Sequence, residues 1–336
     1  MFVTFGVIAT IIAMQQFKSG SVREHAPNNL AMAAIYFMCA FTYPFMYIRT
    51  GLALQWQNTF YILASLLIFS FLGVLGIYIV RELYWTRKDP SRKETRGYTA
   101  FLKMTNNFEY SATRDASRKL LHLVIVGIVM GFHGFAHLLG DFLQSMGITP
   151  LGFTIFSVVT VGYAFITMFM LADTLRLLNG NSLFHLTPDW AHKWFKASLK
   201  ESEIHTMISS VPIVLGLMPF IFSPFWIFVT VALVASLSDA LASVVGKKWG
   251  THKLSVNKLK SWEGLVAGGV ATILFVYLGY YLYSDHLLAF WQVSIIAAAV
   301  SSGIVLIDAF AKRIMDNILN PLVCGAILVI CTGILA

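Results

Sequence analysis

One carboxylate in the interior of an apolar stretch is the residue whose position most strongly suggests chemistry. Asp239 lies in the segment SLSDALASVVGKKWGTHKLSVNKLKSWEGLVAGG, residues 236–269, and inside the apolar run of residues 223–245. An ionisable side chain at such a depth is costly unless it has a partner or a function. Small residues recur beside it at helical spacing, so one helix face would present an acid that another backbone or a ligand can approach closely. These residues are Ala235, Ala242, Ser243 and Gly246.

The loop that follows Asp239 combines glycines with basic side chains. Glycines and lysines beside a carboxylate suit a polyphosphate and its Mg²⁺. The alternative is a helix packed through its small residues and followed by an ordinary basic loop, and the segment alone leaves both interpretations open. The residues concerned are Gly246, Gly250, Lys253, Lys258, Lys260, and the pair Glu263 and Gly264 that opens the next helix.

Three further polar clusters stand at the ends of apolar runs. The first contains Arg118, Lys119 and His122, which alone are typical of membrane anchors. The second pairs Asp173 with Arg176, a spacing that permits a simple ion pair on a helix. The third surrounds the last basic loop and consists of Asp308, Asp316, Asn317, Asn320 and Pro321.

A competing constellation is formed by His133, His137 and Asp141. Their spacing of i, i+4 and i+8 places them on one helix face and could bind a metal. An iron-type oxygenase site would require further histidine clusters, and the sequence has none at a suitable position. We therefore expect these side chains to be hydrogen-bonded residues of a helix bundle.

The elements that carry these residues must lie in a membrane. The chain has 336 residues, of which 57% are hydrophobic and only 12% are charged, and its mean hydropathy is +0.73. A soluble core of this size cannot hide so much apolar sequence, so we predict an all-α, polytopic membrane helix bundle without a soluble domain. The three cysteines have no zinc or disulfide spacing, and GKKWGTHK does not have the order of a phosphate-binding P-loop.

Apolar runs of about 20 residues predict ten transmembrane helices. A turn at Pro219 and Ser223–Pro224 separates the sixth from the seventh. The predicted spans are residues 1–14, 30–48, 59–80, 120–139, 148–172, 206–221, 223–245, 265–283, 287–306 and 318–336.

The basic residues orient these spans. Alternate loops contain 23 of the 24 Lys and Arg residues, and the remaining loops contain only Arg49. Because short basic loops stay in the cytoplasm, both termini are expected outside and all four polar clusters on the cytoplasmic face. The net charge is +8, and the basic side chains are therefore expected to contact anionic lipid headgroups, with no nucleic-acid partner. The basic loops are residues 15–29, 81–119, 173–205, 246–264 and 307–317. The third of these loops is expected to include an interfacial helix from residue 187.

Three motifs resemble the family of CTP-dependent polyprenol kinases, which includes dolichol kinase and phytol kinase. RKLLH is similar to the Arg-Lys-x-x-His signature of that family. DALASVVGKKWGTHKL followed by NKLKSWEG resembles its Asp-x-x-Ala and Gly-x-x-Gly block, and MDNILNPL resembles its closing Asp-Asn motif. Order and spacing agree over residues 117–325. Two positions depart from the pattern, because Ser238 stands where a glycine is common and Asp308 where a glutamate is expected.

This resemblance implies a division into an N-terminal three-span region, residues 1–116, and a membrane catalytic domain, residues 117–336. It also implies transfer of the γ-phosphoryl group of CTP to a lipid alcohol, with Mg²⁺, where the lipid comes from the bilayer and the nucleotide from the cytoplasm. The implied catalytic residues are Asp239, Lys260, Arg118, Lys119 and His122, with Asp239 and Asp316 as metal ligands. The implied cofactor-binding residues are Gly246, Lys247, Gly250, His252, Lys253, Lys258, Ser261, Glu263, Gly264 and Asn317.

Two other functions stay open at this point. KSWEG also resembles the related phosphatidate cytidylyltransferases, although the second acidic signature of those enzymes is not found. A non-catalytic transporter could use the same polar face as a gate, but charged residues are nearly absent from the outer halves of the predicted spans. The identity of the lipid alcohol and the oligomeric state do not follow from the sequence.

Overall fold

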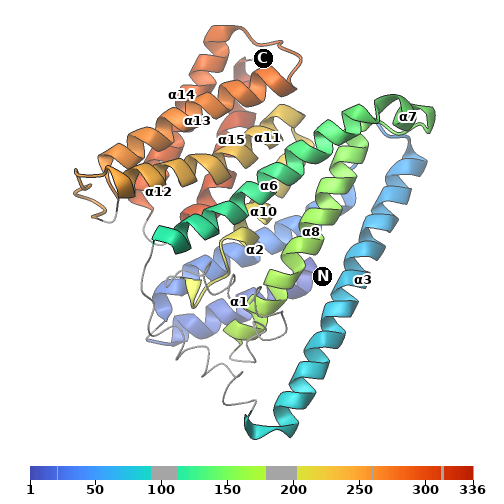
Figure 1. Ribbon diagram of the computed structural model, residues 1–336, viewed down its shortest axis with the longest axis vertical. Coiled ribbons are helices and arrows are strands. Elements are labelled where there is room, and N and C mark those ends of the chain that lie inside the picture. The colour runs from blue at the N-terminus through green and yellow to red at the C-terminus, as the bar shows by residue number, and fades with distance from the viewer. Residues whose placement is uncertain (21, 92–111, 179–202, 259, 312–313, 336) are drawn as a thin grey trace. The chain divides into compact units, whose positions relative to one another are not determined.

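The computed structural model describes residues 1–20, 22–91, 112–178, 203–258, 260–311 and 314–335, without the side chains at positions 82, 86 and 112–121 (Figure 1). The described residues are helical, with no β-strand and one isolated β-bridge. The helices are α1 (Phe2–Lys18), η1 (Arg23–His25), α2 (Ala26–Thr42), η2 (Tyr43–Phe45), α3 (Leu54–Lys88), α6 (Ala112–Leu138), α7 (Gly140–Ser145), α8 (Pro150–Leu177), α10 (Ser210–Leu217), η5 (Met218–Phe222), α11 (Phe225–Leu233), η6 (Val234–Ser238), α12 (Asp239–Lys248), α13 (Trp262–Tyr283), α14 (Phe290–Phe310) and α15 (Asp316–Leu335).

Six helices in the described part of the chain are long and apolar enough to cross a membrane. Three shorter apolar helices accompany them, at Phe2–Lys18, His122–Leu138 and Ser210–Phe222. This finding indicates an integral membrane protein, while ten spans remain a prediction. The six are Leu54–Trp85, Pro150–Leu177, Phe225–Lys248, Trp262–Tyr283, Phe290–Phe310 and Asp316–Leu335.

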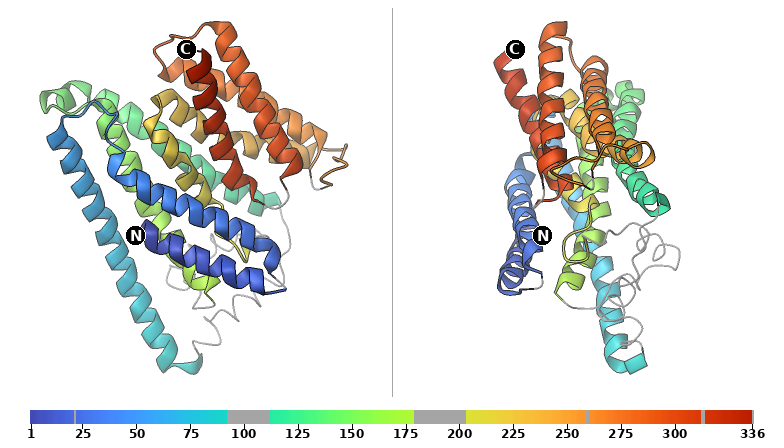
Figure 2. Two further views of the ribbon diagram at one scale, coloured as in Figure 1. Left: turned by 180° about the vertical axis from the view of Figure 1, so that it is seen from behind. Right: turned by 90° about the vertical axis from the view of Figure 1, so that its left-hand side faces the viewer.

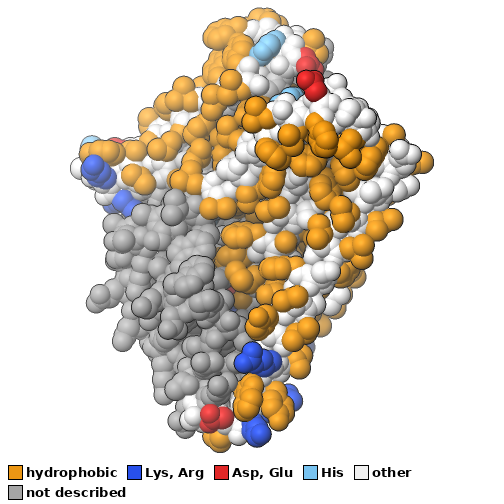
Figure 3. Space-filling view, turned by 45° about the vertical axis from the view of Figure 1, so that its right-hand side comes forward, with side chains coloured by type: hydrophobic (Ala, Val, Ile, Leu, Met, Phe, Trp, Pro, Cys, Tyr) orange, Lys and Arg blue, Asp and Glu red, His pale blue; other side chains and the backbone are white. Residues whose placement is uncertain are grey.

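The surface agrees with this assignment. Apolar side chains cover much of the described face that Figure 3 shows. In α3, for example, Ile77 is 72% exposed and Val80 is 67% exposed. Such a helix would be unfavourable in water, but lipid solvates it.

The chain divides into two compact units. The first consists of residues 1–121 and 136–211, and the second of residues 122–135 and 212–336. The predicted N-terminal region, residues 1–116, lies within the first unit, whereas residues 117–336 contribute to both. The boundary between an N-terminal region and a catalytic domain therefore stays a prediction.

In the first unit, α1 packs against α2, and α3 packs against α8. Its interior contains the fully buried rings of Tyr36, Tyr163 and Phe169. The interfacial helix expected from residue 187, and most of the basic segment 81–119, fall on residues outside the described part of the chain.

In the second unit, α11, η6 and α12 form one continuous helical run, and α13 packs along it (Figure 2). Helix α14 lies between α13 and α15, with contacts to both. The expected turn before α11 is confirmed, because η5 ends at Phe222 and Pro224 caps α11. Four polar side chains carried by these helices and the loop before α13 build the candidate site.

Candidate functional site

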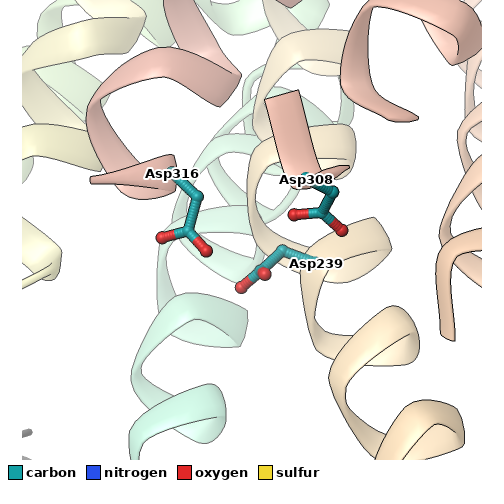
Figure 4. A group of neighbouring side chains, drawn as sticks. All are labelled: Asp239, Asp308 and Asp316. Atoms are coloured by element: carbon teal, nitrogen blue, oxygen red, sulfur yellow. The ribbon is translucent and has the colours of Figure 1, made fainter. Parts of the chain in front are cut away.

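Three aspartates meet in the second unit. Asp239 is the first residue of α12, Asp308 lies in the last turn of α14, and Asp316 is the first residue of α15. One carboxylate oxygen of each lies within 4.8 Å of the others. Figure 4 shows the three side chains pointing toward one another. In the described part of the chain, this is the one group of His, Cys, Asp and Glu side chains with the spacing of a metal site.

A π-helical turn precedes Asp239. Residues Val234–Ser238 form η6, which interrupts the α-helical register between α11 and α12. Such turns re-aim the residues that follow them, and they often occur at functional sites. Ala235, Asp239 and Ala242 are buried, whereas Ser243 and Gly246, which the sequence placed on the same face, are half-buried.

The loop before α13 delivers a cation to the carboxylates. Lys260 Nζ lies 2.9 Å from Asp308 Oδ1 and 3.4 Å from Asp316 Oδ2. Burial alone would lower the pKa of this ammonium group, but the nearby charges of Asp316, Asp308 and Asp239 outweigh it and raise the pKa well above its ordinary value. Lys260 is therefore fully protonated at neutral pH.

The cluster brings three carboxylates and one ammonium group together among side chains that are mostly buried. Carboxylate oxygens are the ligands that hard divalent cations bind. Hard cations bind oxygen ligands at about 2.0–2.6 Å, so opposite ligands lie about 4–5 Å apart. The residues present therefore fit Mg²⁺ in donor type, charge and spacing.

Backbone pairing holds the loop that carries Lys260. A β-bridge joins Lys253 to Ser261, and the N–H of Leu254 donates to the carbonyl of Lys260 at 3.1 Å. The N–H of Trp262 donates to the carbonyl of His252 at 2.9 Å. The loop thus folds back on itself and fixes the position at which the Lys260 side chain leaves the backbone.

Glu263 closes the same loop. Its Oε1 accepts hydrogen bonds from the backbone N–H of Thr251 at 3.2 Å and of His252 at 3.1 Å, and it contacts His252 Nδ1 at 2.7 Å. The sequence placed Glu263 and His252 among the cofactor ligands. In the structure these two side chains bind each other and brace the loop.

The glycines of this segment serve helix packing. A Cβ added at Gly264 would lie 2.6 Å from the carbonyl oxygen of Ala242 and 2.9 Å from Cα of Gly246. A Cβ at Gly246 would lie 2.9 Å from Ser261 Oγ. Ser261 is the N-cap of α13, where its side chain accepts from the N–H of Gly264. The predicted phosphate-binding glycines are thus the contact between α12 and α13, and Gly250 also packs against Ser261.

The other predicted site residues occupy varied positions. Lys247, Lys253 and Lys258 are exposed, and the charge of Lys260 acts on Lys247. His122 is completely buried in α6, whereas the side chains of Arg118 and Lys119 lie outside the described residues. Asn317 is buried in the first turn of α15, beside Asp316.

The clusters that the sequence treated as structural have structural contacts. Arg176 is fully buried, and its Nη2 donates to Asp173 Oδ1 at 2.8 Å and to the carbonyl of Thr206 at 2.6 Å. His133 stacks on the ring of Phe225, with the centroids 4.2 Å apart. Asp173 and Arg176 thus form the expected ion pair. The expectation for His133, His137 and Asp141 is corrected, because α6 ends at Leu138 and Asp141 lies in α7, so the three do not share one helix face, and His137 and Asp141 are exposed.

Sequence reasoning placed Asp308 near the site but did not assign it as a metal ligand. The signal was present, because Asp308 ends an apolar run just as Asp239 interrupts one. What the sequence lacked was the proximity of the two helix ends. Helix α14 ends at Phe310 and α15 begins at Asp316, so Asp308 and Asp316 flank one short connection.

A comparison of this chain with models of protein families, with curated proteins and with solved structures finds no match.

Proposed function

We propose that this protein is an integral membrane kinase that transfers the γ-phosphoryl group of CTP to the hydroxyl of a polyprenol or similar lipid alcohol. One observation carries the proposal: three carboxylates from apolar helices and one lysine from the loop before α13 converge. We infer the identities of the two substrates, CTP and a lipid alcohol, from the sequence motifs around Asp239, Lys260 and Asp316. The arrangement itself supports phosphoryl transfer between a membrane substrate and a soluble one.

Phosphoryl transfer demands positioning and charge neutralisation more than covalent chemistry. We assign Asp239, Asp308 and Asp316 to a Mg²⁺ ion, which supplies positive charge to the phosphate oxygens when it is bound. Lys260 lies beside the same carboxylates, and Lys247 is within range of its charge. These ammonium groups would contact the phosphates of the donor.

The chemical step requires one bond to form and one to break. The oxygen of the alcohol bonds to the γ-phosphorus, and the bond between that phosphorus and the bridging oxygen breaks. CDP leaves with the electron pair, and the hydroxyl proton passes to a carboxylate of the cluster. Asp239 is our candidate for this acceptor, because it is the cluster member that lies within a continuous apolar helical run.

The predicted topology provides a separate route for each substrate. The basic loop 246–264 is expected in the cytoplasm, where nucleotides are, and its exposed Lys253 and Lys258 would attract an anion. The lipid alcohol would arrive from the bilayer along the apolar helices. Arg118 and Lys119, at the cytoplasmic entry of α6, are candidates for further phosphate contacts and for contacts with anionic headgroups.

The test is phosphoryl transfer by the purified protein in detergent. With CTP labelled at the γ-phosphorus, a panel of lipid alcohols and Mg²⁺, label should appear in a lipid product. Chelation with EDTA should abolish the transfer, and added Mg²⁺ should restore it. Transfer that continues at the same rate in EDTA would remove the cation from the proposal, and no transfer to any alcohol would refute the kinase.

A further inference from the structure

A small cavity lies beside the three-aspartate cluster. Asp239 and Asp308 line it, together with Ser238 and Asn320. Apolar and small residues complete its wall, namely Leu265, Gly268, Gly269, Ile304 and Val305. The cavity therefore combines two carboxylates with two neutral polar side chains inside the helix bundle.

Both neutral side chains carry buried oxygens that lack a partner. Asn320 is 2% exposed, and its Oδ1 accepts no hydrogen bond from any described residue. The Oγ of Ser238 is likewise buried without a partner in the described part of the chain. Leaving a buried polar atom unsatisfied is unfavourable, so two such atoms in one cavity indicate that something binds there.

The size of the cavity restricts the ligand. The cavity is too narrow for a water molecule, which excludes a lipid chain. Neighbouring side chains also fill the space beside Gly268 and Gly269. A Cβ at Gly268 would lie 2.9 Å from the Cβ of Ala242, and one at Gly269 would lie 3.1 Å from Ser301 Oγ. A bare cation is smaller than water, and it binds the type of atom that the wall provides.

We propose that Asn320 and Ser238 are neutral oxygen ligands of the divalent cation that the aspartate cluster holds. The inference rests on the metal site of the proposed function and extends it. A set of carboxylate, amide and hydroxyl oxygens is typical of Mg²⁺, Mn²⁺ and Ca²⁺. Asn320 lies in the first turns of α15, one helical turn after Asp316, so both residues can face the same ion.

The experiment measures cation binding without nucleotide or turnover. Mn²⁺ serves as the probe, and its affinity for the purified protein in detergent is determined by electron paramagnetic resonance of the free ion. Asn320→Leu removes the oxygen at similar size and should weaken Mn²⁺ binding about tenfold or more. Ser238→Ala should weaken it in the same direction.

The matched control is Ser301→Ala. Ser301 is also a buried hydroxyl near this cavity, but its Oγ donates to the carbonyl of Gly269 at 2.9 Å. This variant loses a hydrogen bond of the bundle and should bind Mn²⁺ like the unsubstituted protein. An equal loss of affinity in Ser301→Ala and Asn320→Leu would attribute the effect to packing and overturn the inference.

A second variant keeps the test decisive if Asn320→Leu fails to fold. Asn320→Asp retains the oxygen and adds a charge, so it should lower the melting temperature in EDTA. Mn²⁺ should then raise the melting temperature more than it does for the unsubstituted protein, because the added carboxylate binds the ion. A destabilised Asn320→Asp that Mn²⁺ does not rescue would overturn the inference.

The two proposals fail in different ways. If Asp239→Asn loses Mn²⁺ binding while Asn320→Leu and Ser238→Ala keep it, this inference is wrong and the aspartate site stands. If Mn²⁺ binding depends on Asn320 and no phosphoryl transfer is found, the inference stands and the kinase is wrong. If the unsubstituted protein binds no Mn²⁺, both are wrong.

Discussion

Asp239 is a carboxylate inside an apolar helical run, and it directly follows the π-helical turn η6. Replacing it with asparagine keeps the size of the side chain but removes the charge that a hard cation requires. We expect Asp239→Asn to reduce turnover about 100-fold or more, the scale for single acid–base or electrostatic groups. The melting temperature should be unchanged or higher, because Lys260 keeps its contacts with Asp308 and Asp316.

Turnover and melting should be measured on one preparation of Asp239→Asn, with Asp285→Asn as the control. Asp285 is exposed in the connection between α13 and α14, and its substitution should change neither quantity. A melting temperature that drops in proportion to the activity would show that Asp239 is a structural residue.

The ion pairs of Lys260 predict how the stability of the protein depends on pH. Its raised pKa means that its stabilising contacts are fully present below the pKa of an unfolded lysine, about 10.4, and are lost as the pH rises through the higher folded value. In EDTA, Lys260→Met should therefore be less stable than the unsubstituted protein by a constant margin between about pH 7 and 10. The margin should narrow only above that range. Thermal melting across this range checks it, and a margin that disappears near neutral pH would contradict the assigned charge.

At the scale of elements, the contact between α12 and α13 is what positions the site. Gly264→Ala would place a methyl group 2.6 Å from the carbonyl oxygen of Ala242, and backbone atoms cannot move aside easily. Overpacking of this kind costs typically about 1–3 kcal/mol, so we expect a lower melting temperature and reduced turnover together.

Gly333→Ala is the matched control for this contact, because a Cβ at Gly333 in α15 meets nothing within 4 Å. It should leave stability unchanged or raise it slightly, since alanine favours helices over glycine. An unchanged melting temperature in Gly264→Ala as well would contradict the close contact of α12 and α13 at Gly264.

The helices themselves follow from local sequence, but their roles do so only in part. Apolar runs and the turn at Ser223–Pro224 before α11 could be predicted directly, because helix formation and turns depend on nearby residues. Gly246 and Gly264 could not be assigned in this way, since the same glycine pattern suits a phosphate loop and a tight helix contact. The structure adds the helix contact, because it shows that Gly264 lies against Gly246 and the carbonyl oxygen of Ala242.

The contacts of Glu263 and Asp308 also could not be predicted. Glu263 reaches Thr251 and His252 only because the loop folds back, and that path depends on contacts between distant residues. Asp308 joins the site only because α14 ends close to the start of α15. Asp239 could be predicted, because the cost of a buried charge is a property of its local sequence.

At the scale of the molecule, the basic loops predict which face carries the site. In a variant without Cys39, Cys324 and Cys331, a cysteine at exposed position 258 should be labelled by an impermeant reagent only from the cytoplasmic side. A cysteine at position 285, at the other end of α13, should be labelled only from outside. Labelling of position 258 from outside would place the aspartate cluster on the wrong face for a cytoplasmic nucleotide.

The most direct test of the whole account compares two labels in one assay. The purified protein is incubated with Mg²⁺, a lipid alcohol and CTP that carries label at either the γ-phosphorus or the α-phosphorus. The account predicts that label enters the lipid from the γ position alone and that CDP is released. Label that enters the lipid from the α position, with release of pyrophosphate, would contradict it and identify a cytidylyl transfer instead.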